Sequence, residues 1–505
     1  MEQKGITVAT VSLRTAEDIL ARDGLFADSA AIEARNLARY RLGLSLLAAR
    51  DTRHADVLHA LSLEEDDRLL PVLADPVLRN AFEDDTACLE NGVFTASALG
   101  GYLAEGAWPL SADGTGPCES LMRSRARPWP GTGAGWVWTG LRATASRQPM
   151  AERLLELCLN SFEPGNRTEP FDATPEMVEA LRQGADLLTS LLPQIGPSVL
   201  RHVSLIGFSD GDSADGPLQS LSGGDPLPSA ILMSPGRLRE PWTTAETLLH
   251  EAAHLKLFDV LRSCSLVEDG TARVPIPWRQ SSWSFIRVLV ALHFYAHLTV
   301  FQSAAREAAP ELVARYGTPL AGEVIDEPTP GSPAAALGTH RTVLERLTYL
   351  AEQALCADHG QVTPEGRRFV HWLLDAVEHC EPGVRSLVRV PPPATADPSD
   401  EPHSPDGVFV RNEPVLVREL PALRQLLVLL PDQARFHWLD AHTWTVYALC
   451  EGASLTSLAE RYRRTVHGPM GEDAARRITS RCLDPLLAAG LVSRADASIV
   501  PGGTP

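Results

Sequence analysis

The stretch TTAETLLHEAAHLKLF, residues 243–258, predicts a buried helix with two histidines one turn apart. His250 and His254 are four residues apart, so on a helix both imidazoles leave the same face and can bind one metal ion. Thr243 and Glu246 have the spacing of a capping box, which indicates that the helix begins there. Because two histidines and a glutamate are costly to bury without a ligand, the stretch predicts a metal site.

The metal site needs a further ligand, and the sequence offers several. Glu251 follows the first histidine and could bind the metal, orient a ligand or act as a base. Glu268 has the place that a zinc peptidase of the thermolysin type would use, but it stands in a Val-Glu-Asp-Gly turn. His293 is the better candidate, because it lies in the apolar helical stretch LVALHFYAHL, residues 289–298. Its partner in that stretch, His297, is the lesser candidate, and one of the two is expected to be an ordinary hydrogen-bonded core histidine.

Arg279 ends the segment PIPWR, residues 275–279, between the two expected helices. An arginine at this place can bind a carboxylate with two parallel hydrogen bonds. A surface ion pair explains the residue equally well, so both interpretations stay open.

The composition describes a globular chain with a sizeable core. Its 505 residues, 44% of them hydrophobic and 22% charged, allow two to four domains. The net charge of −19 argues against nucleic acid as a partner. The eight cysteines form no CxxC pair and no secretory signal is visible at the N-terminus. The longest apolar stretch, Ile286–Phe301, is interrupted by charged and polar residues. We therefore expect a cytoplasmic protein without a membrane partner.

Four segments are expected along the chain, in a fold that is mainly α with small β elements. Residues 1–170 form a mainly helical N-terminal region, and residues 171–385 form the helical metal-binding and catalytic domain. Residues 386–407 are a proline-rich acidic linker, because prolines remove hydrogen-bond donors and acidic residues resist burial. Residues 408–505 form a separate C-terminal module.

The C-terminal module is expected to be a winged helix-turn-helix of three strands and three helices. The strands are expected at Val415–Arg418, Leu426–Leu429 and Arg435–Leu439, and the helices at Ala441–Glu451, Leu455–Val466 and Glu472–Ala489. Such a fold usually binds DNA. However, residues 406–505 hold eleven arginines and no lysine against eleven acidic residues, a balance that is unusual for a DNA-binding domain.

The segments LLHEAAHLKL, PWR, LHFYAHL and VTPEGRRFVHWLL resemble the HExxH-motif peptide-modification proteins, across roughly residues 170–380. This family contains iron- and 2-oxoglutarate-dependent peptide β-hydroxylases of ribosomal natural-product pathways. The resemblance implies Fe(II) as cofactor, with 2-oxoglutarate and O2 as co-substrates. It implies His250, His254 and His293 as the iron site, Glu251 and Arg279 as catalytic residues, and Arg279 as the residue that binds 2-oxoglutarate.

The run FHWLDAHTWTVYALCEGASLTSLAERY, with LLAAGLVSR further on, resembles PqqD-like precursor-peptide recognition elements. Such elements bind a leader peptide as an added strand. The residues expected to contact the peptide are Arg435, Phe436, His437, Trp438, Leu439, Arg476, Arg477 and Arg481. The three arginines of the last helix would favour an acidic leader, although a solvated helix face explains them almost equally well.

These features predict post-translational modification of a ribosomally synthesised precursor peptide. The leading hypothesis is Fe(II)/2-oxoglutarate-dependent β-hydroxylation of a core-peptide side chain while the C-terminal module holds the leader. Other enzymes of the same pathway would then be further partners. Two alternatives stay open: a zinc metallopeptidase that cleaves the precursor, with Glu251 activating water, and a non-catalytic scaffold that presents the peptide.

Overall fold

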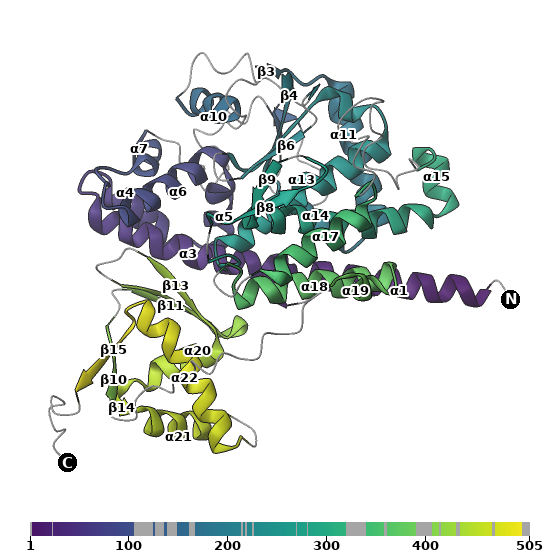
Figure 1. Cartoon of the computed structure of the whole chain (residues 1–505). Coiled ribbons are helices and arrows are strands. Elements are labelled where there is room, and N and C mark those ends of the chain that lie inside the picture. The colour runs from purple at the N-terminus through teal and green to yellow at the C-terminus, as the bar shows by residue number, and fades with distance from the viewer. Residues whose placement is uncertain are drawn as a thin grey trace. The chain divides into compact units, whose positions relative to one another are not determined.

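The computed structural model describes residues 3–22, 24–105, 125–126, 136–138, 149–160, 167–213, 216–217, 220–224, 227–268, 270–279, 281–319, 340–357, 361–389, 407–413, 416–430, 435–466 and 470–496 (Figure 1). The chain divides into two compact units. The first comprises Met1–Asn36, Glu64–Asp85 and Ser97–Pro391, and the second Leu37–Leu63, Thr86–Ala96 and Pro392–Pro505. Most of the expected linker, residues 390–406, lies outside the described residues, and the four-segment division stays a prediction.

Helices predominate and the sheets are small, which confirms the expected fold class at that level. The described helices of the first unit are α1 (Gln3–Arg22), α2 (Gly24–Ala27), α3 (Ser29–Arg50), α5 (Asp66–Ala74), α6 (Pro76–Glu90), α7 (Ala98–Ala104), α10 (Pro149–Asn160), α11 (Pro175–Leu191), α12 (Ile195–Leu200), α13 (Pro241–Leu261), α14 (Phe285–Arg306), α15 (Pro310–Tyr316), α17 (Val343–Cys356), α18 (Pro364–Cys380) and α19 (Val384–Leu387). Helices α3 and α6 continue into the second unit.

A seven-stranded sheet lies in the first unit, with the strand order β1-β2-β4-β7-β6 and with β3 and β5 also paired to β4. Its strands are β1 (Arg125–Ala126), β2 (Trp136–Trp138), β3 (Arg167–Phe171), β4 (Leu205–Ser213), β5 (Gly216–Pro217), β6 (Ser220–Gly223) and β7 (Leu227–Met233). Strands β2, β4 and β7 run parallel, and β6 is antiparallel to β7 at one end of the order. Helix α13 packs against β6 and β7 (Figure 1), so the edge of the sheet lies beside the helix that carries the histidines.

Helix α13 begins earlier than the capping-box spacing indicates. It starts at Pro241, with Glu240 as the N-cap residue and no side-chain cap bond. The expected box of Thr243 and Glu246 is therefore wrong. Proline is favoured in the first helical turn because the missing N–H would be unpaired there anyway, so Pro241 outweighs the threonine signal. Glu246 consequently lies inside the helix, one turn before His250.

A buried ion-pair network holds the C-terminal half of α13. Asp259 forms an ion pair with Arg79, which also donates to Ser229 Oγ. His202 Nδ1 donates to the other Asp259 oxygen over 2.6 Å. Burial alone would raise the pKa of Asp259, but Arg79 and His202 outweigh it and hold that pKa well below its usual range. The contacts of Asp259 with Arg79 and His202 therefore join α13 to helix α6 and to the segment before β4.

The network continues to Lys256, one of two lysines in the sequence. His202 Nε2 lies 3.0 Å from Ser29 Oγ, which lies 2.9 Å from Ser198 Oγ. Lys256 Nζ donates to Ser198 Oγ over 2.8 Å and to the carbonyl oxygen of Leu20 over 3.2 Å. Burial lowers the pKa of Lys256 to about 7. Polar groups along α13 are thus joined to α1, α3 and α12 within the first unit.

Helix α14 is a core helix of the first unit, packed against α13, α17 and α18. It is the one described helix that is long and apolar enough to cross a membrane, but 72% of its most apolar window is buried inside the protein. Burial in the core therefore accounts for the apolar composition of this helix. A cytoplasmic location stays a prediction.

The second unit contains helix α4 (Ala55–Ser62) and, near the C-terminus, α20 (Ala441–Leu449), α21 (Leu455–Thr465) and α22 (Glu472–Ala488). One three-stranded sheet has the order β11-β12-β13, formed by Leu416–Leu420, Gln425–Leu429 and Phe436–Leu439. These elements lie where the sequence predicts three strands and three helices. A second sheet, β14-β10-β15, was not expected; its strands are Glu451–Ser454, Gly407–Arg411 and Val492–Asp496.

The two faces of the β11-β12-β13 sheet pack against different elements of the second unit. One face, with Leu439, belongs to the core formed with α20, α21 and α22. The other face, with Phe436 and Trp438, packs against Ala38 and Leu42 of α3. Alternate residues of a strand point to opposite faces, so the short strand β13 is enclosed on both.

Candidate metal centre

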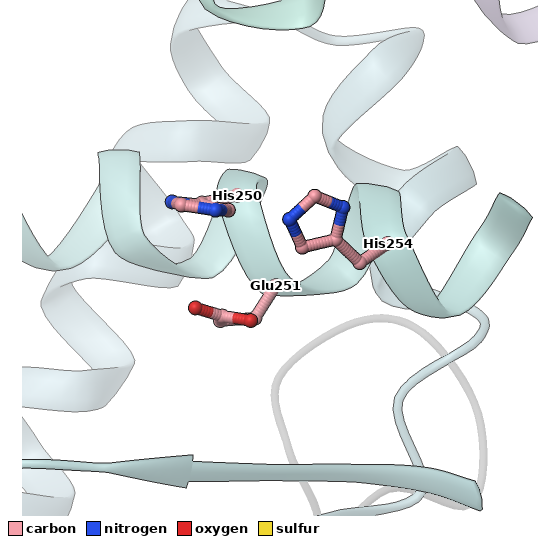
Figure 2. Close-up of side chains that lie close together, drawn as sticks. All are labelled: His250, Glu251 and His254. Atoms are coloured by element: carbon pink, nitrogen blue, oxygen red, sulfur yellow. The ribbon is translucent and has the colours of Figure 1, made fainter. Parts of the chain in front are cut away.

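His250, Glu251 and His254 form one group on α13, with potential ligand atoms that all lie within 4.8 Å of one another. Figure 2 shows the three side chains leaving the same helix, with the two imidazoles one turn apart. The imidazole centroids are 4.7 Å apart. Two imidazoles and a carboxylate at this spacing are a donor set that suits Zn²⁺ or Fe²⁺. The structure therefore brings together three of the residues that the sequence predicts.

Both imidazoles of this group are held in the neutral form that binds metals. Burial, together with the positive charge of Arg237, lowers the pKa of His250 to about 3. Burial and the neighbouring His250 lower the pKa of His254 to about 3. Metal binding at neutral pH would thus not need to remove a proton from either histidine.

The surroundings fix the orientation of each member of the group. Phe294 of α14 stacks on His250, with ring centroids 3.6 Å apart and an angle of 12° between the planes. Ser220, at the start of the edge strand β6, donates to Glu251 Oε1 over 2.6 Å. His254 Nδ1 is buried without a hydrogen-bond partner among the described residues. An unpaired buried polar atom is costly, and a ligand at this place would remove that cost.

Two charged side chains that the sequence did not single out for a functional role lie close to this group. Arg237 belongs to the 3-10 turn η1 (Pro235–Leu238) just before α13. Its pKa is lowered by burial and raised by the negative charges of Glu246 and Glu251. Burial raises the pKa of Glu246, while Arg237 opposes the shift. The metal group thus has a cation and a second carboxylate as neighbours.

His293 is buried on α14 but is not a member of the three-residue group. Its ring stacks on Phe369 and Trp372, with centroid distances of 5.7 and 6.0 Å. Burial, followed by the nearby His297, holds its pKa well below the usual value. His297 Nδ1 donates to the carbonyl oxygen of His293 over 2.9 Å, so His297 is a hydrogen-bonded core histidine. The role of His293 as a ligand stays a prediction.

Arg279 lies in the turn between strands β8 (Arg273–Ile276) and β9 (Ser281–Ser284), where its backbone N–H donates to the carbonyl oxygen of Ile276. Its side chain is exposed. The exposed position gives no support to the expected contact with 2-oxoglutarate, which stays a prediction.

The residues expected to contact a peptide lie on two elements of the second unit. Arg435 is exposed, Phe436, His437 and Trp438 are half-buried, and Leu439 is buried. Strand β13 is an edge strand, paired with β12 alone in the described part of the chain. On α22, Arg477 and Arg481 are exposed and Arg476 is half-buried. Strand β13 packs against α20.

Three residues of the metal centre were missed by sequence reasoning, for different reasons. Glu246 had a visible signal, because it precedes His250 by one helical turn, but the capping-box interpretation assigned it to the start of the helix. Ser220 and Arg237 belong to other elements and reach the site only through the pairing of β6 with β7 and the turn before α13. The chain matches no protein-family model and no curated protein.

Proposed function

We propose that the protein is an Fe(II)- and 2-oxoglutarate-dependent hydroxylase of a ribosomally synthesised peptide. The supporting observation is the group of His250, Glu251 and His254, because two histidines and one carboxylate are the donor set typical of non-haem Fe(II) oxygenases. Bound iron would supply the O2 chemistry that attack on an unactivated C–H bond requires. The reaction converts a peptide C–H group, O2 and 2-oxoglutarate into C–OH, CO2 and succinate.

The protein residues would perform three tasks in this reaction. His250 and His254 would bind the metal as neutral imidazoles, which burial favours. Ser220 would hold the Glu251 carboxylate in one orientation. Phe294 would shield one face of His250 from water, since the rings are in contact. Such shielding strengthens electrostatic interactions within the site.

The C-terminal module would hold the leader peptide. An edge strand carries unpaired N–H and C=O groups along one side, which are a template for an added strand. Strand β13 has this property, and the buried nitrogens His437 Nε2 and Trp438 Nε1 have no hydrogen-bond partner among the described residues. Holding the leader raises the effective concentration of the core peptide at the metal.

A zinc peptidase is the second candidate, and the Ser220–Glu251 hydrogen bond favours it. A glutamate held beside two metal-binding histidines can act as the base that activates a metal-bound water. The edge strand β6 lies against α13, where an extended peptide could pair with it.

One assay separates the two candidates. The full chain is loaded with Fe(II) or Zn²⁺ and incubated with 2-oxoglutarate and candidate precursor peptides. The proposal expects succinate and one added oxygen atom per peptide with Fe(II) alone, and neither product in His250→Ala. Cleaved peptide with Zn²⁺, without succinate under either condition, would replace the hydroxylase with the peptidase.

A further inference from the structure

The side chain of Arg237 has no hydrogen-bond acceptor among the described residues. Its turn is fixed to α13, because Thr244 Oγ1 donates to the Arg237 carbonyl oxygen over 2.9 Å. The side chain is half-buried, and its Nε is buried with no partner in the part of the chain that the structure describes. Among the described residues it forms no ion pair within 4 Å, although Glu246 and Glu251 both interact with it electrostatically. A guanidinium in this state binds an acceptor readily, since burial without one is costly.

The position of Arg237 relative to the metal group indicates which ligand would fit. The turn that carries Arg237 packs against α13, the helix of the metal group, and is bonded to Thr244, six residues before His250. A divalent cation bound by His250 and His254, together with Arg237, carries more positive charge than Glu246 and Glu251 can balance. An anionic ligand between the metal and Arg237 would remove the excess charge. A planar guanidinium matches a carboxylate with two parallel hydrogen bonds.

Arg279 does not share these properties. It lies in the β8–β9 turn with an exposed side chain, so its donors are open to solvent. An exposed arginine gains little from binding a carboxylate, whereas a partly buried one near a metal gains more.

We propose that Arg237, rather than Arg279, binds the carboxylate of the ligand that reaches the metal. This inference rests on the proposed function, in which that ligand is 2-oxoglutarate and the group bound by Arg237 is the carboxylate farthest from its keto group. Arg237 is then a residue that determines the choice of co-substrate. Keto acids without the distal carboxylate would bind the metal through the keto end alone.

The test compares two ligands that differ only in this carboxylate. Fe(II)-loaded full-length protein is titrated without oxygen, by calorimetry, with 2-oxoglutarate and with 2-oxopentanoate. Arg237→Gln should weaken 2-oxoglutarate binding by about 100-fold and leave 2-oxopentanoate binding unchanged. Arg239→Gln is the matched control, because Arg239 caps the same turn with an exposed side chain. Arg279→Gln tests the competing residue, and neither of these two variants should alter binding of either ligand.

Unchanged iron content and unchanged 2-oxopentanoate binding show that the Arg237 variant is folded with an intact metal site. If wild-type protein binds 2-oxoglutarate and Arg237→Gln binds it equally tightly, the inference is overturned and the proposed function stands. If Arg279→Gln instead shows the selective loss, the expectation from the family resemblance replaces the inference. If the iron-loaded wild type binds neither keto acid, the proposed function fails and the inference fails with it.

Discussion

Two helices of the first unit each carry a histidine pair at the same spacing, and the pairs have nearly the same local geometry. The ring centroids are 4.7 Å apart with an interplanar angle of 71° for His250 and His254 on α13. They are 4.3 Å apart with an angle of 62° for His293 and His297 on α14. The first pair has Glu251 as a third potential ligand and Arg237 as a charged neighbour. The second pair contacts aromatic rings and a backbone carbonyl.

The spacing of four residues therefore provides the geometry of a metal site but not its chemistry. On α13 a carboxylate completes the donor set, and a serine on another element fixes that carboxylate. On α14 the Nδ1 atom of His297 is used by the helix itself, in a bond to the carbonyl oxygen one turn back. The Nε2 atom of His297 has no hydrogen-bond partner among the described residues, so the two pairs differ in the neighbouring carboxylate and not in that hydrogen bond.

The largest expected effect comes from removing the first pair. His250→Ala or His254→Ala should reduce metal affinity by more than about 100-fold, because each takes away one donor from the group. The measurement is metal content after dialysis against graded chelator. His297→Leu is the control on the second pair and should keep its metal. Loss of metal in His293→Leu would add His293 to the ligands, as the family resemblance implies, and the contrast between the pairs would break.

A second prediction tests how α13 tolerates charge in the core. Asp259→Asn should lower the free energy of unfolding by about 3–5 kcal/mol, because it removes the buried carboxylate that forms the ion pair with Arg79. Denaturant unfolding of the metal-free protein measures this change. The exposed pair of Glu179 and Arg182 on α11 is the control, and Glu179→Gln should lower the free energy of unfolding far less than Asp259→Asn does. Equal losses would mean that the buried network does not anchor α13.

A third prediction concerns the stability of the protein at acidic pH. Burial lowers the pKa of His297 to about 3, below the value of about 6.5 for an unfolded histidine. Between these values the unfolded state binds a proton that the folded state does not, so stability falls as the pH is lowered from about 6.5 to about 4. His297→Leu should reduce the slope of unfolding free energy against pH in this window by about 1.4 kcal/mol per pH unit. An unchanged slope in metal-free protein would show that His297 titrates normally.

The smallest expected effect is the loss of one hydrogen bond to Glu251. Ser220→Ala should leave the metal content unchanged and lower kcat for 2-oxoglutarate turnover by about 10-fold, because Glu251 loses its fixed orientation. Ser222→Ala, two residues along the same strand, is the matched control. A fall in metal content with unchanged kcat per bound metal would mean that Ser220 stabilises the site without orienting a reacting group.

Local patterns in the sequence predicted the helices well. Helices α20, α21 and α22 lie within two residues of their predicted bounds. The HExxH spacing predicted that His250 and His254 share a face of α13. These features depend on the 3.6-residue period of a helix, which nearby residues determine.

The surroundings of those helices were decided by the tertiary structure. Strand β2 pairs with β4 across about 70 residues, and strand pairing at such a distance leaves no local pattern in either segment. Ser220 reaches Glu251 only because β6 is the edge strand beside α13, and Arg237 is held near the start of α13 because its turn is bonded to Thr244 of that helix. Both histidine pairs can be read from the sequence alone. The carboxylate beside the first pair, Glu251, follows from the same helix, whereas Ser220 and Arg237 belong to other elements that fold onto α13, and helix periodicity contains no information about them.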